Sequence, residues 1–175
     1  IQSKTKKGGD RFLLEMATGT GKTTTSAAII KMFLRLYKVN RVLFLVDRLE
    51  LETQAKKEIN DILKNDFETV IWKENQDDWR RAKIVISTVQ SFTRHNKYKR
   101  IFKSNSFDLV ISDEAHRSLG ASSRNVFEYF IGFKLGLTAT PRDFLKSVNE
   151  DDMSMTDPKE LERRLMLDTY SIFGC

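Results

Sequence analysis

Cysteine is almost missing from this chain: the only one is Cys175, the last of 175 residues. A lone cysteine excludes a disulfide or a cysteine zinc site within the chain and fits a reducing cytoplasm. No apolar run approaches the roughly 18 residues of a membrane span, so no membrane partner is expected. The first nine residues are polar and basic and lack the apolar core of a signal peptide. A cytoplasmic globular domain without repeats or low-complexity tracts is the expectation.

Acidic residues are scarce at one end of the chain and abundant at the other. Residues 1–40 carry eight Lys/Arg against two acids, whereas residues 150–175 carry three against seven. The formal net charge is +6 and the sequence pI is about 9.4, so the basic excess lies in the body of the domain. A polyanionic partner would fit, but a solvated basic surface explains so modest an excess equally simply. Charge alone decides little.

Segments of strand length alternate along the chain with segments of helical periodicity. We expect strands at 12–16, 41–46, 68–72, 83–87, 107–112 and 134–138, and helices at 22–37, 49–63, 89–102 and 122–130. Near-continuous apolar runs such as Val42–Val46 are typical of strands covered on both faces. The predicted fold class is therefore α/β, a parallel sheet with helices on both faces. Residues 147–157 are expected to form an exposed acidic loop and 158–167 a helix with proline at its first position.

A glycine-rich turn joins the first expected strand to the first expected helix. Gly19 and Gly21 let the backbone turn so that successive N–H groups point inward, as a triphosphate requires. Lys22 can reach the β- and γ-phosphates, the Thr23 hydroxyl can ligate Mg²⁺, and the helix N-terminus adds partial positive charge. The predicted nucleotide-binding residues are Thr18, Gly19, Thr20, Gly21, Lys22, Thr23 and Thr24.

Two features qualify this interpretation. A Gly-Lys-Thr triplet by itself also occurs at strand-to-helix turns for purely steric reasons. Met16 stands where the strict phosphate-loop pattern has its first glycine, and we expect it to be a strand-end residue pointing into the core.

An acidic pair, Asp113-Glu114, follows the apolar strand at 107–112. The carboxyl ends of parallel strands form the crevice in which open α/β sheets bind ligands. Asp113 is predicted to hold Mg²⁺ through water opposite Thr23, and Glu114 to deprotonate the water that attacks the γ-phosphate. The alternative is a helix N-cap, which acids also favour. The phosphate loop about 90 residues earlier favours the nucleotide interpretation.

The phosphate loop, Asp-Glu-Ala-His at 113–116 and Thr-Ala-Thr at 138–140, in this order, resemble the first RecA-like domain of superfamily 2 helicases and translocases. The resemblance covers residues 12–141 and implies ATP with Mg²⁺ and nucleic acid crossing the top of the domain. It also implies that His116, Thr138 and Thr140 couple hydrolysis to the nucleic-acid site. A packed or capping histidine is the alternative for His116, and a simple turn for the two threonines.

The resemblance also places two segments where the superfamily approaches nucleic-acid phosphates. The candidate contacts are Arg48, Gln54, Thr88, Gln90 and Ser91. Asp47 replaces the usual threonine of the first segment, and ordinary solvated helix starts explain the same residues. The basic run at 97–100 is either a salt-dependent contact with nucleic acid or a solvated surface.

Within the superfamily, the amino-acid sequence at 15–23, 43–48 and 113–118 resembles that of the motor subunit of type I restriction endonucleases. This implies ATP-driven translocation on double-stranded DNA, in an assembly with specificity and methyltransferase subunits. Residues 1–145 would be the first motor domain, truncated at its N-terminus, and 146–175 an acidic linker and helix toward a second motor domain. The alternatives are a lobe of another DNA or RNA helicase and a non-catalytic, nucleotide-gated nucleic-acid-binding module. Glu114 argues against the last, because a binder needs no general base.

Overall fold

One parallel sheet organises the molecule, which was analysed as a computed structural model. The structure describes residues 1–17, 19–36, 39–63, 66–74, 78–115, 121–141 and 169–173. Within them the strands are β1 (Arg11–Glu15), β2 (Val42–Val46), β3 (Thr69–Ile71), β4 (Ile84–Thr88), β5 (Leu109–Ser112) and β6 (Phe133–Thr138). Their order in the sheet is β1-β6-β5-β2-β4-β3, and every neighbouring pair is parallel.

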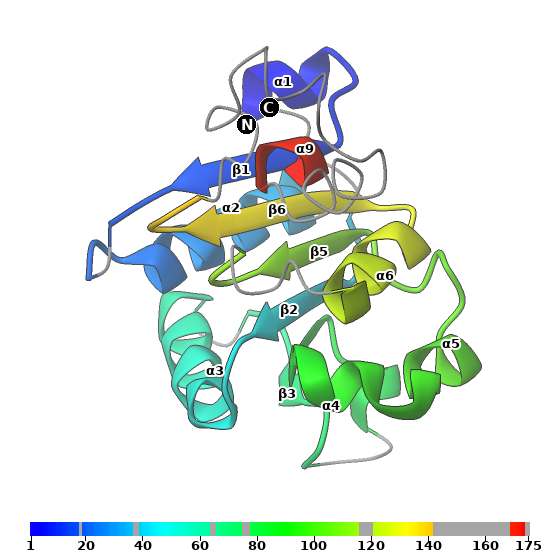
Figure 1. The fold of residues 1–175 in the computed structure, drawn as a ribbon. Coiled ribbons are helices and arrows are strands. Elements are labelled where there is room, and N and C mark those ends of the chain that lie inside the picture. The colour runs from blue at the N-terminus through cyan, green and yellow to red at the C-terminus, as the bar shows by residue number, and fades with distance from the viewer. Residues whose placement is uncertain are drawn as a thin grey trace, which may run out of the picture.

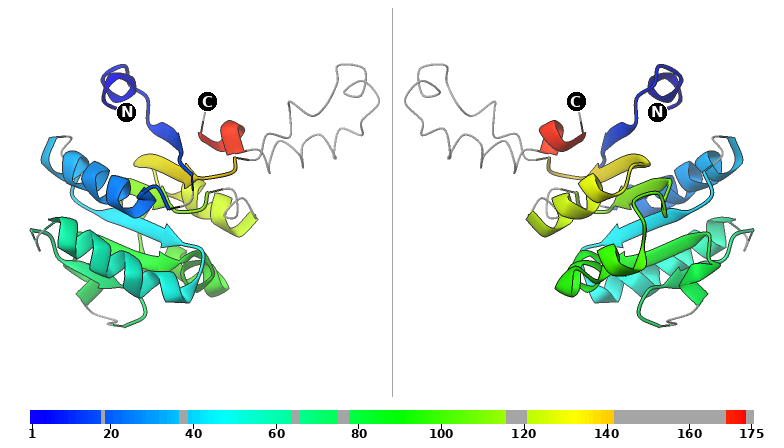
Figure 2. Two further views of the ribbon diagram at one scale, coloured as in Figure 1. Left: turned by 90° about the vertical axis from the view of Figure 1, so that its left-hand side faces the viewer. Right: turned by 90° about the vertical axis from the view of Figure 1, so that its right-hand side faces the viewer.

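Helices cover both faces of this sheet (Figures 1 and 2). On one face lie α2 (Lys22–Leu36) and α3 (Leu49–Leu63). On the other lie α4 (Val89–Thr93), α5 (Lys97–Ile101), α6 (Ala121–Tyr129) and α9 (Thr169–Phe173). Two short 3₁₀ helices, η1 (Asp78–Arg80) and η2 (Arg94–Asn96), and the N-terminal α1 (Gln2–Lys6) complete the described elements.

The strands divide their side chains between two hydrophobic cores. Successive strand residues point to opposite faces, so Phe44 packs toward α2 and α3 while Leu43 and Leu45 pack toward α4 and α6. All five residues of β2 are fully buried, as expected for a strand covered on both sides. The predicted α/β class with helices on both faces is confirmed.

The prediction of one helix over 89–102 is wrong. The chain runs through α4, η2 and α5, and His95 and Asn96 adopt left-handed backbone angles with φ of 54° and 53°. A straight helix would place Phe92 and Tyr98 about 120° apart around its axis. The break instead brings both rings into the core, where they stack with centroids 5.7 Å apart. Burial of these aromatic side chains outweighs the local helical preference.

The C-terminal helix α9 lies against β1 and β6, a contact that the sequence did not indicate. Phe173 packs over Gly136, where an added Cβ would lie 2.6 Å from the ring. The Arg11 guanidinium donates to the carbonyl of Ile172 at 2.8 Å, and the Tyr170 hydroxyl donates to Glu15 at 2.7 Å. The expected loop at 147–157 and helix at 158–167 lie outside the described residues.

Candidate nucleotide site

The glycine-rich turn follows β1 directly, and its backbone bends as the sequence predicts. Gly19 and Gly21 have φ of 78° and 84°, a region in which only glycine is unstrained. The Thr20 hydroxyl closes the turn by donating to the Ala17 carbonyl at 2.7 Å. Helix α2 then begins at Lys22, so its first N–H groups face the turn. Met16 is partly buried against the core beneath α2 and α3, as expected.

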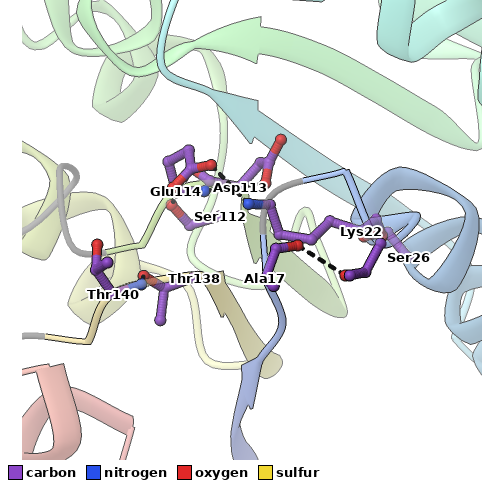
Figure 3. Close-up of polar contacts among 9 residues, drawn as sticks. Ala17, Lys22, Ser26, Ser112, Asp113, Glu114, Thr138 and Thr140 are labelled. Carbon is purple, nitrogen blue, oxygen red and sulfur yellow. Dashed lines mark hydrogen bonds and ion pairs between the residues drawn. The ribbon is translucent and has the colours of Figure 1, made fainter.

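Lys22 meets Glu114 across the sheet. The ammonium Nζ lies 2.8 Å from Glu114 Oε1, and the two side chains point toward each other in Figure 3. Their side chains are 9% and 22% exposed, so the pair is partly shielded from water. The contact joins the phosphate loop to the acidic pair, which the sequence separates by 92 positions.

Asp113 lies on the same side, at the carboxyl end of β5. Its backbone N–H donates to the Leu45 carbonyl at 2.9 Å, and its carboxylate accepts from the N–H of Glu114 at 3.0 Å. Burial raises the pKa of Asp113 above its ordinary value, and the neighbouring negative charge of Glu114 adds to the rise. Glu114 itself has a φ of 52°, an uncommon angle for a residue with a side chain. Backbone strain of this kind concentrates at functional sites.

Strand β6 runs between the two halves and is bonded to both. The Thr138 carbonyl accepts from the N–H of Met16 at 2.8 Å, at the entry to the phosphate loop. One residue earlier, the Leu137 carbonyl accepts from the N–H of Ala115 at 2.8 Å, directly after the acidic pair. The buried Thr138 hydroxyl accepts from the exposed Thr140 N–H at 3.2 Å. A movement of β6 would therefore reach both halves of the site.

The remaining residues of the predicted site differ in exposure, and two of them lie outside the described ranges. Thr23 is half-buried and Thr24 exposed on the first turn of α2, while Thr18 and His116 lie outside the described residues. Within the described ranges no three His, Cys, Asp or Glu side chains cluster as metal ligands. A magnesium ion held by one hydroxyl, one carboxylate and phosphate oxygens needs no such cluster.

The predicted nucleic-acid contacts do not form one group. Arg48 is exposed with its guanidinium 3.6 Å from Asp47, and Gln54 donates to Glu58 at 2.9 Å. Gln90 is exposed on the first turn of α4.

Thr88 and Ser91 have a role in the helix itself. The Thr88 hydroxyl accepts from the Ser91 N–H at 3.2 Å and donates to the Ser91 hydroxyl at 2.6 Å, which caps α4. The alternative of an ordinary helix start therefore accounts for Thr88 and Ser91.

Sequence reasoning missed Glu52, which holds the ends of β4 and α3 together. It is 5% exposed, and its carboxylate accepts from the Thr88 N–H at 2.6 Å. Burial raises its pKa, and this hydrogen bond partly opposes the rise. A glutamate in the first turn of a helix is expected to lie at the surface, so no sequence pattern indicated that Glu52 is buried.

A loop that turns at two glycines leads into a helix, and an acidic pair lies two strands away in the same parallel sheet. Together these features define a RecA-like nucleotide-binding domain of the phosphate-loop class. The chain belongs to the family described as "Type III restriction enzyme, res subunit", whose model matches residues 1–143.

The curated relatives include endonuclease subunits of type I restriction enzymes. The chain is 35% identical over 147 residues to that of EcoAI from Escherichia coli, a match covering 78% of this chain and 17% of the relative. It is 30% identical over 174 residues to that of EcoKI from Escherichia coli strain K12, covering 81% and 14%. It is also 31% identical over 132 residues to a putative ATP-dependent helicase, IRC3, of Saccharomyces cerevisiae, covering 71% and 18%. The chain spans less than a fifth of the length of these relatives.

Solved structures share the fold. The SWI2/SNF2 ATPase core of Sulfolobus solfataricus, in complex with double-stranded DNA, matches with a TM-score of 0.68 and 15% identity, over 99% of this chain and 32% of that one. The Type ISP restriction-modification enzyme LlaGI, solved as a nuclease-deletion mutant with a DNA substrate mimic, matches with a TM-score of 0.60 and 26% identity, over 79% and 16%. The predicted helicase-type family and its relation to type I restriction subunits are confirmed. Among the described residues no helix is long and apolar enough to cross a membrane.

Proposed function

We propose that this chain is the ATP-hydrolysing lobe of an ATP-dependent double-stranded DNA translocase in a type I restriction enzyme. The ion pair between Lys22 and Glu114 carries the proposal. An ammonium has three donors, so Lys22 can bind a γ-phosphate oxygen while it holds the Glu114 carboxylate. Lys22 would then link the carboxylate to the phosphate through two hydrogen bonds, which places a general base close to the group that water attacks.

ATP with Mg²⁺ is the cofactor we propose. The loop N–H groups and Lys22 would hold the phosphates, and Thr23 and Asp113 the ion. A bound cation would stabilise the ionised form of Asp113 and so oppose the rise in its pKa that burial causes. A bound Mg²⁺ would supply charge neutralisation, while the chain would supply orientation through its loop N–H groups and the general base.

The wider assembly is part of the same proposal. The type I restriction relatives support DNA as substrate, since each is named as the endonuclease subunit of a restriction enzyme. Double-stranded DNA, specificity and methyltransferase subunits as partners, and a cytoplasmic location are proposed from the resemblance of the motifs. His116, Thr138 and Thr140 are proposed to couple hydrolysis to DNA. The bonds from β6 to both halves of the site support the role of the two threonines.

Two substitutions test the site in the full-length protein. Lys22→Ala should weaken MgATP binding, because it removes the phosphate-facing charge. Glu114→Gln should retain MgATP binding but slow hydrolysis by about 10²–10⁴-fold, the usual contribution of a general base. Titration with a fluorescent ATP analogue and steady-state ATPase rates measure the two effects.

A matched control comes from the same helix. Lys31 lies 3.5 Å from Asp66 on the outside of α2, so Lys31→Ala should change neither quantity. Unchanged nucleotide affinity in Lys22→Ala would reject the phosphate-loop assignment. Equal hydrolysis rates for wild type and Glu114→Gln would favour the nucleotide-gated binding module instead.

A further inference from the structure

A hollow of about 1210 Å³ lies beside the β3 side of the sheet, against α4, η2 and α5. These helices are the green elements at the lower right of Figure 1. Its lining comes from three chain segments: the two residues directly after β3, two residues of η1, and seven of the twelve residues at 90–101. We call this hollow the basic groove. Its basic residues are Lys73, Arg80, Arg94, His95, Lys97 and Arg100.

Among the described residues, no ion pair neutralises the positive charge of the basic groove. Some cations elsewhere do have acidic partners, as Arg11 lies 3.2 Å from Glu128. Likewise Arg35 lies 2.8 Å from Asp66. Within the described part of the chain, no ion pair joins a groove lysine or arginine to an acid, and no acid lines the groove. Uncompensated charge on a concave surface attracts a polyanion.

The two tryptophans of the chain lie at the floor and position the cations. Lys97 Nζ is 5.8 Å from the ring centroid of Trp72, and the Arg80 guanidinium carbon is 5.4 Å from that of Trp79. The two residues are only 8% and 9% exposed. Single-strand-binding surfaces stack bases on exposed aromatic faces, which this floor does not offer. The groove is therefore suited to phosphates and not to bases.

The break between α4 and α5 determines which cations reach the groove. The left-handed turn at His95 and Asn96 separates Arg94 from Lys97, and both line the groove. Arg100 lies three residues after Lys97, on the same helix face. Lys99 does not line the groove; its ammonium lies 5.8 Å from the centroid of its neighbour Tyr98. The basic run therefore divides into groove and non-groove cations.

We propose that the basic groove binds the phosphate backbone of duplex DNA. It extends the predicted contact at Gln90 and Ser91, which also line the groove, to the cations beside them. The inference rests on the proposed function, because it takes DNA as the substrate of the motor. Contact with phosphates alone holds DNA of any sequence, which a translocating protein requires.

The test compares two triple substitutions in the full-length protein. The groove variant is Arg94→Ala/Lys97→Ala/Arg100→Ala. The control, Lys57→Ala/Lys99→Ala/Lys103→Ala, removes the same charge from exposed positions outside the groove. Binding of two unrelated 30-base-pair duplexes, a single strand and polyglutamate is measured by anisotropy at several salt concentrations. MgATP binding by each variant checks that the fold is intact.

The groove variant should lose about 10-fold or more in affinity for both duplexes. The slope of log affinity against log salt should fall by about 2–3, since each lost phosphate contact removes roughly 0.9. The control should keep the wild-type slope. Equal losses in both variants, or a groove effect confined to single strands or to polyglutamate, would overturn the proposal. A failure of the proposed function would give a different result: Lys22→Ala would keep the wild-type affinity for MgATP, whatever the salt slopes of the groove variant.

Discussion

At the scale of single residues, Glu52 shows how a buried charge is tolerated beside the site. Its carboxylate accepts from the backbone N–H of Thr88, at the point where β4 ends and α4 begins. Burial raises its pKa above the ordinary value of 4.5, so the folded protein binds a proton more readily there than the unfolded chain. Where the folded state holds more protons, the free energy of unfolding falls as pH rises.

Glu52→Gln should therefore gain stability relative to wild type as pH rises from 4 to 8. The amide oxygen can accept the same hydrogen bond, but it carries no charge to desolvate. Each unit by which the pKa is raised corresponds to about 1.4 kcal/mol at the upper end of the range. Urea unfolding of both proteins at each pH gives the difference, in which carboxylates common to both cancel. A difference that is constant with pH would contradict the raised pKa.

At the scale of elements, α9 depends on a strand residue without a side chain. Phe173 lies over β6 at Gly136 and meets Phe127 of α6 with ring centroids 5.6 Å apart. The same helix bonds to β1 through Ile172 and Tyr170. Because β1 leads into the phosphate loop, the docked helix is linked to the strand that carries the loop.

Gly136→Ala should displace α9 from the sheet. The new Cβ would lie 2.6 Å from the Phe173 ring, and overpacking of this kind costs about 1–3 kcal/mol. Hydrogen exchange should show lost protection at residues 170–173, with the central strands still protected. Adding Phe173→Leu to Gly136→Ala makes room and should restore part of the protection. Unaltered exchange in the single variant would mean that α9 does not depend on this contact.

At the scale of the whole molecule, two halves of a site from distant parts of the chain meet at one edge of the sheet. The phosphate loop follows β1, the acidic pair follows β5, and β6 lies between them. The relatives are more than five times longer than the aligned part of this chain, which leaves room for further motor parts. In related phosphoryl transfers, an arginine from a second domain contributes about 10³–10⁵ in rate.

We therefore expect residues 1–175 alone to bind MgATP but to hydrolyse it slowly. The full-length protein with duplex DNA should turn over about 10³–10⁵ times faster, since a second lobe would supply the arginine. Steady-state ATPase rates of both, with and without DNA, make the comparison. Robust DNA-stimulated turnover by residues 1–175 would show that this lobe needs no such partner.

Local patterns predicted most of the elements because each depends on neighbours in the sequence. Helix α3 begins and ends where its periodicity does, and the apolar runs became buried strands. The break at His95 and the docking of α9 were not predictable in this way. Both depend on aromatic side chains that contact partners far away in the sequence: Phe92 contacts Trp72 and Phe130, and Phe173 contacts Phe127. Long-range packing overrides local preference at these positions.

Residue type and spacing were enough to recognise Gly19, Gly21, Lys22 and the acidic pair, and so to predict the nucleotide chemistry. Which groups lie in contact became clear only from the fold. It placed Lys22 on Glu114, bonded β6 to both halves, and gathered separate basic segments around two tryptophans. The physical reason is that a strand order of β1-β6-β5-β2-β4-β3 is set by packing across the whole core. No local sequence pattern predicts that strand order.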